Sequence, residues 1–400
     1  SDPYNAINGN LKLGYSVSDA FKMNIYGSFD KFKADFDDAF IGVDAANRSL
    51  SNQYRIGFSP RYKYKNGSIT LNAAFNNIER EIESNFPSQF NAESYTVDVF
   101  NRYNFNDTYY TVLGVNAQQN IMESFAIPFG SSYFEQAINP DDATFTIIDP
   151  YLNVVYISDF GLSVNTGVRI NNHSEYGSHF VYSINPSFKE DVSFGYIKGL
   201  ASYSTAYIVP SLYQLFEPTY GNGELQPEEN RTIEVGAELN FTNKAIISLV
   251  YFNRNETNFI DFVDLGDFVY QYRNIDKTFT ASGLELSANY NITEKIKLNA
   301  NGTYTKVEDN LNLRIPELKV NASLDYNISD ESFISLRYQF NDDRRDSVYN
   351  NATFINDDIT LDSYSLLDLY ISRKFIKDKL TVFANMTNIL NADYVELSGY

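Results

Sequence analysis

The sequence predicts an all-β fold, a transmembrane antiparallel β-barrel, on three observations. Apolar and polar residues alternate with a period of two along segments that often exceed ten residues. Short polar connections between these segments alternate with longer ones. Aromatic residues make up 16% of the 400 residues, as 32 Tyr and 31 Phe. Such a composition suits a wall that faces lipid and carries aromatic girdles at the membrane interfaces.

The composition also excludes several classes of protein. The chain has no Cys, which excludes a disulfide scaffold, a thiolate metal site and a Cys nucleophile. The formal charge of −20 argues against a nucleic-acid partner, because phosphate binding requires a basic surface. With 43% apolar residues, the chain is not a disordered acidic tail. An apolar run of 18 residues, as a transmembrane helix needs, is absent.

The period of two is clearest in residues 294–308. Ile296, Leu298 and Tyr304 fall on one face, whereas Lys295 and Asn299 fall on the other. A helix would scatter both sets around its axis, but a strand separates them. The same pattern predicts eighteen strands: 6–16, 21–32, 51–65, 68–82, 92–105, 108–123, 145–157, 160–173, 178–188, 191–204, 231–242, 245–260, 268–292, 294–308, 317–329, 331–343, 361–375 and 378–388.

The connections between the strands predict how the barrel is oriented. In an antiparallel sheet, alternating lengths place every tight turn at one end and every long loop at the other. Outer-membrane barrels have this asymmetry, with periplasmic turns and extracellular loops. The tight turns are Val17–Ala20, Asn66–Gly67, Asn106–Asp107, Ser158–Asp159, Lys189–Glu190, Asn243–Lys244, Thr293, Asp330 and Ile376–Lys377. The other connections are 33–50, 83–91, 124–144, 174–177, 205–230, 261–267, 309–316 and 344–360.

A soluble β-protein is the structural alternative to a membrane barrel. Propellers have short strands and a fixed repeat of about 40–50 residues. This sequence shows neither feature, and its predicted strands exceed the soluble average of about five or six residues. The pattern therefore favours the membrane barrel.

No arrangement of residues points to catalysis. His173 and His179 flank the connection 174–177, but a spacing of six with no Cys is a poor zinc site. We interpret them as solvated histidines. Nucleophile-elbow, P-loop and dinucleotide fingerprints are also absent from the sequence.

One acidic segment is a candidate metal site. Residues 30–44 read DKFKADFDDAFIGVD and place Asp30, Asp35, Asp37, Asp38 and Asp44 in or beside one long connection. Closely spaced carboxylates suit Ca²⁺, which takes six to eight oxygen ligands. The spacing does not match the EF-hand, so an ordinary acidic surface loop is the alternative.

Aromatic residues gather in the predicted long connections. Exposed rings on loops offer a large rigid contact area for a ligand. The alternative is an interface girdle or packing between loops. The candidate ligand-binding residues are Phe86, Phe90, Tyr133 and Phe134.

Residues 201–236 resemble the signature of TonB-dependent outer-membrane receptors. The segment reads ASYSTAYIVPSLYQLFEPTYGNGELQPEENRTIEVG. Its matching parts are the P-S-L-x-Q-L run from Pro210 to Leu215, the following Y-G-N, the L-x-P-E at Leu225–Glu228 and the E-x-G at Glu234–Gly236. Two further stretches resemble the family, at Asn274 with Gly283-Leu284-Glu285 and at Asn388–Tyr394.

Within that family the chain is most similar to the vitamin B12 (cobalamin) transporters. The strand and loop lengths, the order of the motifs and RIPELK at Arg314–Lys319 carry this similarity. The acidic segment resembles the calcium-binding loops of those transporters. The resemblance therefore implies Ca²⁺ held in an extracellular loop, with Asp35, Asp37, Asp38 and Asp44 as candidate ligands.

The resemblance also predicts that residues 1–400 are part of a larger barrel domain. Family members have 22 strands around a plug, preceded by a signal peptide and a TonB-contacting segment. The direction of the eighteen predicted strands makes them strands 4–21. The plug and the last strand are then not part of this sequence, which stops within the family's N-x-x-Y element at Asn391–Tyr400.

The function implied by the resemblance is cobalamin import across the outer membrane of a Gram-negative bacterium. Extracellular loops would capture the nutrient, and the TonB complex would rearrange the plug. The expected partners are outer-membrane lipid, TonB, cobalamin or another large nutrient and a surface lipoprotein, and not nucleic acid. A siderophore or haem receptor is the alternative within transport. An outer-membrane barrel enzyme and a passive porin are the alternatives from other classes.

Overall fold

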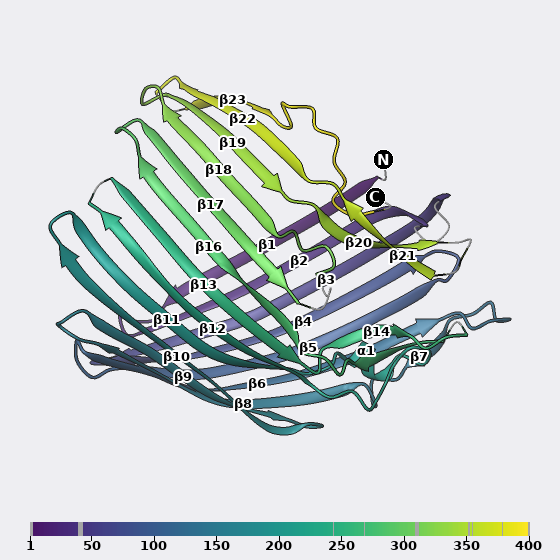
Figure 1. Cartoon of the computed structure of the whole chain (residues 1–400). Helices are drawn as coiled ribbons and strands as arrows, with labels where there is room; N and C mark the ends of the chain where they lie inside the picture. Colours follow the sequence, from purple (N-terminus) through teal and green to yellow (C-terminus); the bar gives the residue numbers. More distant parts are fainter. Residues whose placement is uncertain are drawn as a thin grey trace.

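The computed structural model describes residues 3–38, 43–242, 244–267, 269–308, 312–350, 353, 355–377 and 379–398. These residues form one antiparallel sheet of 19 strands, two separate two-stranded hairpins and one short helix. Figure 1 shows the large sheet curving into a barrel wall. The described part of the chain has no helix that is long and apolar enough to cross a membrane.

Eighteen long strands build the wall, and each pairs with the next wall strand along the chain. This confirms the eighteen predicted strands. Their bounds are β1 Tyr4–Ser16, β2 Phe21–Asp38, β3 Val43–Tyr64, β4 Gly67–Glu83, β5 Ser88–Asn104, β6 Tyr109–Ala126, β8 Thr144–Ile157, β9 Leu162–His173, β10 Gly177–Val192, β11 Gly195–Ile208, β12 Glu228–Phe241, β13 Ala245–Thr257, β16 Phe279–Asn291, β17 Ile296–Val307, β18 Leu318–Asn327, β19 Ser332–Asn341, β22 Tyr364–Phe375 and β23 Leu380–Met386.

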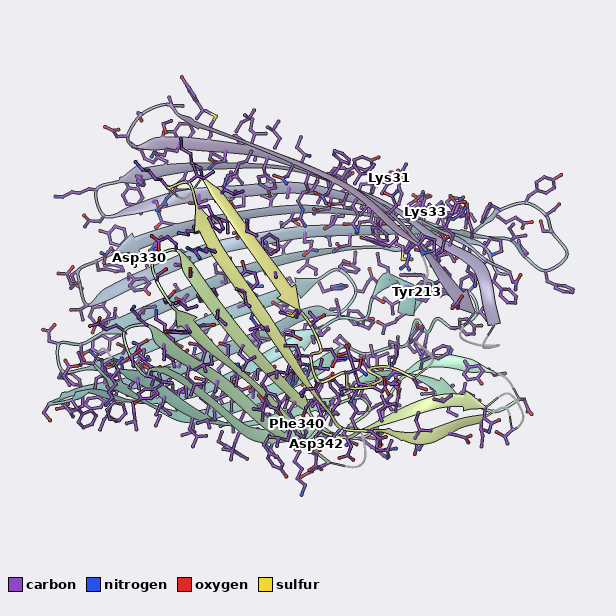
Figure 2. All side chains as sticks on the ribbon, turned by 90° about the horizontal axis from the view of Figure 1, so that it is seen from above. Lys31, Lys33, Tyr213, Asp330, Phe340 and Asp342 are labelled. Carbon is purple, nitrogen blue, oxygen red and sulfur yellow. The ribbon has the colours of Figure 1, made fainter. Side chains whose placement is uncertain are left out.

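The remaining elements all lie at one end of the wall. The helix α1 (Leu212–Phe216), the strand β7 (Glu135–Ile138) and the hairpins β14–β15 (Ile260–Asp264, Tyr270–Asn274) and β20–β21 (Arg344–Asn350, Ile355–Leu361) gather there. We call this end the loop end and the opposite end the turn end. Asp330 marks the turn end and Asp342 the loop end in Figure 2. The predicted asymmetry of turns and loops is therefore confirmed.

The wall has an apolar outer face and a polar lumen face. On the outer face, Phe29 pairs with Tyr54 and Ile25 pairs with Phe58, and these side chains are exposed in the isolated chain. On the lumen face, the Tyr151 hydroxyl donates to Asp98 Oδ1 at 2.9 Å. A soluble protein would bury its apolar face, whereas this wall presents it outward. The apolar face therefore needs a lipid environment.

The first and last wall strands each pair on one side only. Among the described residues, β1 pairs with β2 and β23 pairs with β22, and no ladder joins β1 to β23. Nearly all residues of both strands are exposed. The assignment of the eighteen strands as strands 4–21 of a 22-stranded barrel stays a prediction.

Two of the predicted long connections are much shorter than predicted. The segment 33–50 is mostly strand, because β2 continues to Asp38 and β3 begins at Val43. The predicted connection 83–91 is likewise shorter in the structure, since β4 ends at Glu83 and β5 begins at Ser88. Beyond the membrane, water solvates both faces of a strand, so the alternation disappears from the sequence. The backbone ladder continues there regardless, because its hydrogen bonds do not depend on side chains.

Other boundaries also differ from the prediction. The predicted strand 268–292 is two elements, because β15 pairs with β14 outside the wall and only β16 pairs with β13. The tight turn predicted at Lys189–Glu190 lies instead after Val192, where Val192 pairs with Gly195. A short helix forms in 205–230, where only a connection was predicted.

Candidate ligand-binding site at the loop end

The helix α1 is built from a short-range capping signal. The Ser211 side chain accepts a hydrogen bond from the Gln214 amide at 3.2 Å, and the Gln214 side chain accepts one from the Ser211 amide at 2.8 Å. This reciprocal pair is a capping box, which satisfies two amides of the first turn. Leu212 then faces inward and is buried against Ile138 and Ala143. The helix is thereby anchored to the β6–β8 side of the wall.

Residues 209–227, here called the strap, connect β11 to β12 and are fastened to the β14–β15 hairpin. Asn274 binds Gln226 twice, because its Oδ1 accepts from the Gln226 amide and its Nδ2 donates to the Gln226 carbonyl, both at 2.8 Å. The Asn222 Nδ2 donates to the Tyr272 carbonyl at 3.0 Å, and the Tyr272 amide donates to the Tyr220 carbonyl at 3.0 Å. The strap is therefore a fixed element and not a free loop.

The β9–β10 connection supports the strap from the wall side. The Tyr176 hydroxyl donates to the carbonyl of Leu225, which is almost fully buried, at 3.1 Å. Burial, followed by the nearby Tyr207 and Glu175, raises the pKa of Tyr176 to about 12. The hydroxyl is therefore protonated and available as a donor at neutral pH.

His173 stabilises the same connection and is unsuited to bind a ligand. Its Nδ1 accepts from the Glu175 amide at 3.1 Å, and its ring lies 4.7 Å from Phe145 and 5.1 Å from Tyr176. Burial lowers the pKa of His173, although Glu175 opposes that shift. The neutral imidazole is therefore a packed residue, and the predicted solvated histidine is wrong for this position.

A row of aromatic rings crosses the loop end inside the wall. Phe90 on β5 meets Tyr213 on α1 edge to face, with ring centroids 6.0 Å apart. Tyr213 then meets Tyr272 at 6.3 Å, and Tyr272 lies 5.1 Å from Phe262, which contacts Tyr220 at 5.3 Å. The Tyr272–Phe262 contact is tilted and the other three are edge to face, and together they fix the rings relative to one another. Figure 2 places Tyr213 between the two sides of the wall.

The aromatic row combines apolar faces with hydroxyl donors. Burial, followed by the charge of Glu217, raises the pKa of Tyr213 to about 12 and also raises that of Tyr272. Both phenols are therefore protonated at neutral pH and can donate hydrogen bonds. Such a surface suits a large, ring-bearing ligand with polar substituents.

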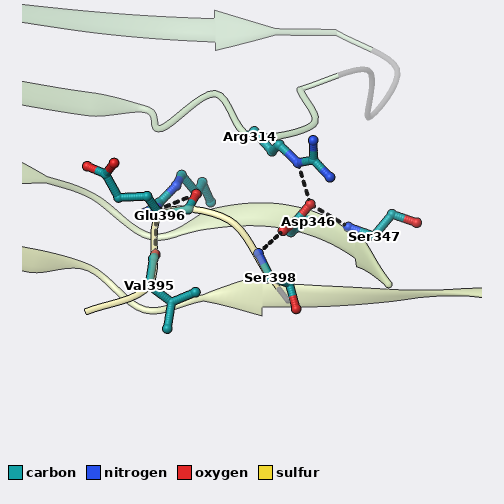
Figure 3. Close-up of polar contacts among 7 residues, drawn as sticks. Arg314, Asp346, Ser347, Val395, Glu396 and Ser398 are labelled. Atoms are coloured by element: carbon teal, nitrogen blue, oxygen red, sulfur yellow. Dashed lines mark hydrogen bonds and ion pairs between the residues drawn. The ribbon is translucent and has the colours of Figure 1, made fainter. Parts of the chain in front are cut away.

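A second polar cluster joins three segments of the loop end around Asp346 (Figure 3). The buried Asp346 carboxylate accepts from Arg314 Nε at 2.6 Å and from the amides of Ser347 and Ser398, each at 2.9 Å. Burial alone would raise the pKa of Asp346, but these bonds outweigh it and lower the pKa. Arg344 adds donor bonds to the carbonyls of Val395 and Glu396.

Of the four predicted ligand-binding aromatics, only Phe90 belongs to the row. Phe86 lies between β4 and β5 with 89% of its surface exposed. Tyr133 and Phe134 precede β7, and Tyr133 is 77% exposed. No ring contact joins these three to the row within the described residues. Their role in ligand binding stays a prediction.

The four predicted calcium ligands lie on two paired strands. Asp35 and Asp37 lie on β2, where Asp35 accepts from Arg48 Nε at 3.1 Å. Asp38 ends β2 and Asp44 lies on β3, but their side chains fall outside the described residues. The described part of the chain contains no group of three or more His, Asp or Glu side chains placed for a metal ion. Calcium binding stays a prediction.

Of the five rings in the row, only Phe90 is among the ligand-binding residues that the sequence predicts. Tyr272 falls in the predicted strand 268–292, and Phe262 falls in the predicted connection 261–267. The alternation in residues 270–274, after a turn that contains glycine and aspartate, is the available signal for a separate hairpin. Only the fold shows that this hairpin lies beside α1.

Three comparisons place the chain among known proteins. Residues 2–389 match the family described as TonB dependent receptor-like, beta-barrel. The chain is 28% identical over 241 residues to the vitamin B12 transporter BtuB of Vibrio cholerae, a match that covers 59% of this chain and 37% of that protein. The chain thus matches little more than a third of this relative's length.

Solved structures share the fold at lower identity. The copper transporter OprC superposes with a TM-score of 0.79 and 13% identity, over 98% of this chain and 67% of that chain. The siderophore receptor PirA from Acinetobacter baumannii superposes with a TM-score of 0.77 and 16% identity, over 98% and 67% of the two chains. Together with the wall and its apolar outer face, these matches show that the chain belongs to the TonB-dependent receptor β-barrel family of the Gram-negative outer membrane.

Proposed function

We propose that the protein containing this chain imports a large, scarce nutrient by TonB-dependent transport, and that the nutrient is cobalamin. The aromatic row is the observation that carries the proposal. It offers flat apolar surface and phenol donors at the loop end, which faces the cell exterior in this family. The 28% identical relative is a vitamin B12 transporter, which favours cobalamin as the first candidate.

Capture and transport are separate steps in this proposal. The loop end binds the nutrient, with Phe90, Tyr213 and Tyr272 as the first contacts. TonB, drawing on the inner-membrane proton gradient, then rearranges a plug inside the wall. The polar lumen face, with groups such as Asp98 and Tyr151, suits a plug or water better than lipid. A surface lipoprotein that covers the loops is a further proposed partner.

A siderophore is the second candidate, because catechol rings would stack on the same aromatic row. Haem is favoured less, since haem receptors offer His or Tyr ligands on loops and His is scarce in this chain. His173 is buried, and the ring of His179 stacks on Tyr207 at 4.1 Å, so a haem ligand would have to be a tyrosine. The match of residues 2–389 to the TonB-dependent receptor family argues against a passive porin. The family consists of transporters and receptors, so we propose transport and not catalysis.

The test measures binding of cyanocobalamin and of a ferric catecholate siderophore to the purified full-length protein by titration calorimetry. We expect tight binding of cyanocobalamin, weakened about tenfold or more by Tyr213→Ala, as for a central aromatic contact. Phe241→Ala is the matched control, because Phe241 stacks on Phe194 at the turn end, with centroids 5.1 Å apart. Tight siderophore binding without cobalamin binding would refute the choice of nutrient.

We also propose that the acidic segment holds an accessory Ca²⁺ ion. Its ligands would be Asp35, Asp37, Asp38 and Asp44. Its binding must compete with Arg48, which already neutralises Asp35. The titrations are therefore repeated with Ca²⁺ and with a chelator. A cobalamin affinity that does not depend on Ca²⁺, and that is unchanged in Asp35→Ala/Asp37→Ala/Asp44→Ala, would remove this assignment.

A further inference from the structure

The outer face of β1–β5 carries an apolar hollow that side chains leave unfilled. The hollow measures about 680 Å³, and Gly9 and Gly27 lie in its floor. Leu11, Phe29 and Ile56 are among the large apolar residues that surround it. A second apolar hollow of about 470 Å³ adjoins it over β3–β5. Because both hollows face lipid, acyl chains are their natural contents.

A polar groove of about 240 Å³ lies directly beyond the apolar hollow, on the loop side of the same strands. The ladder pairs Lys31 with Asn52, Asn52 with Glu79 and Glu79 with Asn91, so these four residues form one row across β2–β5. The row spans three strand spacings, or about 14 Å. Lys31 follows Phe29 by two residues on the same face of β2, so the apolar surface meets the polar groove at this point.

The next row toward the loop end adds a second ammonium group. Lys33 pairs with Leu50, and Leu50 pairs with Glu81. Lys31 and Lys33 lie in the half of β2 nearest the loops (Figure 2). The described residues contain no ion pair that engages either lysine. Lys31 lines the groove together with amides and carboxylates, and Lys33 lies in the next row on the same face. Two ammonium groups therefore lie at the loop-side border of the apolar surface.

We propose that the outer face of β1–β5 binds one acylated, phosphorylated saccharide lipid of the outer leaflet. Lys31 and Lys33 bind its phosphate, since an ammonium is a good phosphate partner. Asn52, Glu79 and Asn91 hydrogen-bond the sugar hydroxyls, and the glycine-floored hollow takes an acyl chain. A groove about 14 Å wide fits a disaccharide better than the small headgroup of a phospholipid. This proposal does not depend on which nutrient the loops capture.

The test uses the purified full-length protein, delipidated in detergent, and native mass spectrometry to measure lipid binding. The probes are diphosphorylated lipid A, monophosphorylated lipid A and phosphatidylethanolamine. We expect the diphosphorylated lipid to bind best. Lys31→Glu/Lys33→Glu should weaken its binding by about tenfold or more, as for the loss of charge-assisted bonds. The matched control is Lys12→Glu/Lys22→Glu, which changes two lysines on the lumen face of β1 and β2.

A second variant tests the apolar hollow independently of charge. Gly27→Leu fills the hollow, and the first atom beyond its new Cβ, the Arg55 carbonyl oxygen, lies 3.6 Å away. The wall therefore accommodates the change, and lipid A binding should fall severalfold while the midpoint of thermal unfolding is unchanged. Equal binding of lipid A and phosphatidylethanolamine, or unaltered lipid A binding in both variants, would overturn the proposal.

Discussion

Asp346→Asn should release the C-terminal segment of the loop end without disturbing the wall. Asp346 Oδ1 accepts hydrogen bonds from Arg314 Nε and from the Ser347 amide. Its Oδ2 accepts the hydrogen bond from the Ser398 amide. Asparagine keeps one oxygen, which can serve Arg314 and Ser347. Its NH₂ group then faces the Ser398 amide, so two donors meet where a hydrogen bond stood.

The magnitude follows from that single lost bond. A hydrogen bond to a charged group contributes about 1.5–3 kcal/mol, which corresponds to about a 10- to 150-fold change in an opening equilibrium. The ion pair between Arg314 and Asp346 is left out of this magnitude, because the Arg314 side chain is 47% exposed and water replaces much of the interaction. We therefore expect the Ser398 amide to exchange its hydrogen about 10- to 150-fold faster in the variant.

The assay is hydrogen exchange followed by mass spectrometry on the peptide that contains Ser398. Asp358→Asn is the control on the same hairpin, because Asp358 is 69% exposed and its pair with Arg345 should contribute little. Exchange at Ser398 that is equal in the two variants would refute the reasoning. The pKa of Asp346 is lowered from 3.8, so its contribution is complete above that pH. The contribution is lost only as the pH falls through the lowered pKa.

Three further predictions concern the strap, its support and the turns. Asn274→Ala removes three side-chain hydrogen bonds, two to Gln226 and one to the Asn258 carbonyl, so the Gln226 amide should exchange about tenfold faster; unchanged exchange would contradict the fixed strap. The lowered pKa of His173 means that the stability it gives the β9–β10 connection is complete above pH 6.5 and is lost as the pH falls through the lowered pKa, which proton titration by NMR checks; a pKa above 6.5 would contradict this. Gly161→Ala places a Cβ 2.0 Å from the Lys189 carbonyl oxygen, whereas Gly177→Ala meets no atom within 4 Å, although both positions have positive φ. The urea concentration at the midpoint of unfolding should therefore fall more for Gly161→Ala than for Gly177→Ala. Equal midpoints would contradict this prediction, because they would show that the backbone shifts to relieve the contact.

The fold was predictable because lipid imposes a strong pattern on each strand. Residues 294–308 alternate cleanly, and β17 occupies Ile296–Val307. The pattern fails where the constraint ends. Above the membrane, the row of Asp35, Arg48 and Glu83 continues the ladder of β2–β4 with charged side chains. Hydropathy marks such residues as a connection, whereas backbone hydrogen bonding keeps them in strands.

The candidate site was predictable only in part, because its residues come from segments far apart in the chain. Phe90 was identified from its position near a connection. Its partner Tyr213 is more than a hundred residues away, and Tyr272 is more distant still. Ring contacts of this kind depend on how the loops fold over the wall. Local sequence shows that the aromatic residues are present, but not which of them meet.

The sequence by itself therefore determined the barrel wall, its two faces, the direction of its strands and the resemblance to its family. All of these depend on local alternation and on motifs read along one segment. The tertiary structure decided which rings form the row, how Asp346 joins three segments and where Lys31 lies beside Asn52. Those features depend on ladder register and on loop packing, and a shift of one residue would send each side chain to the other face.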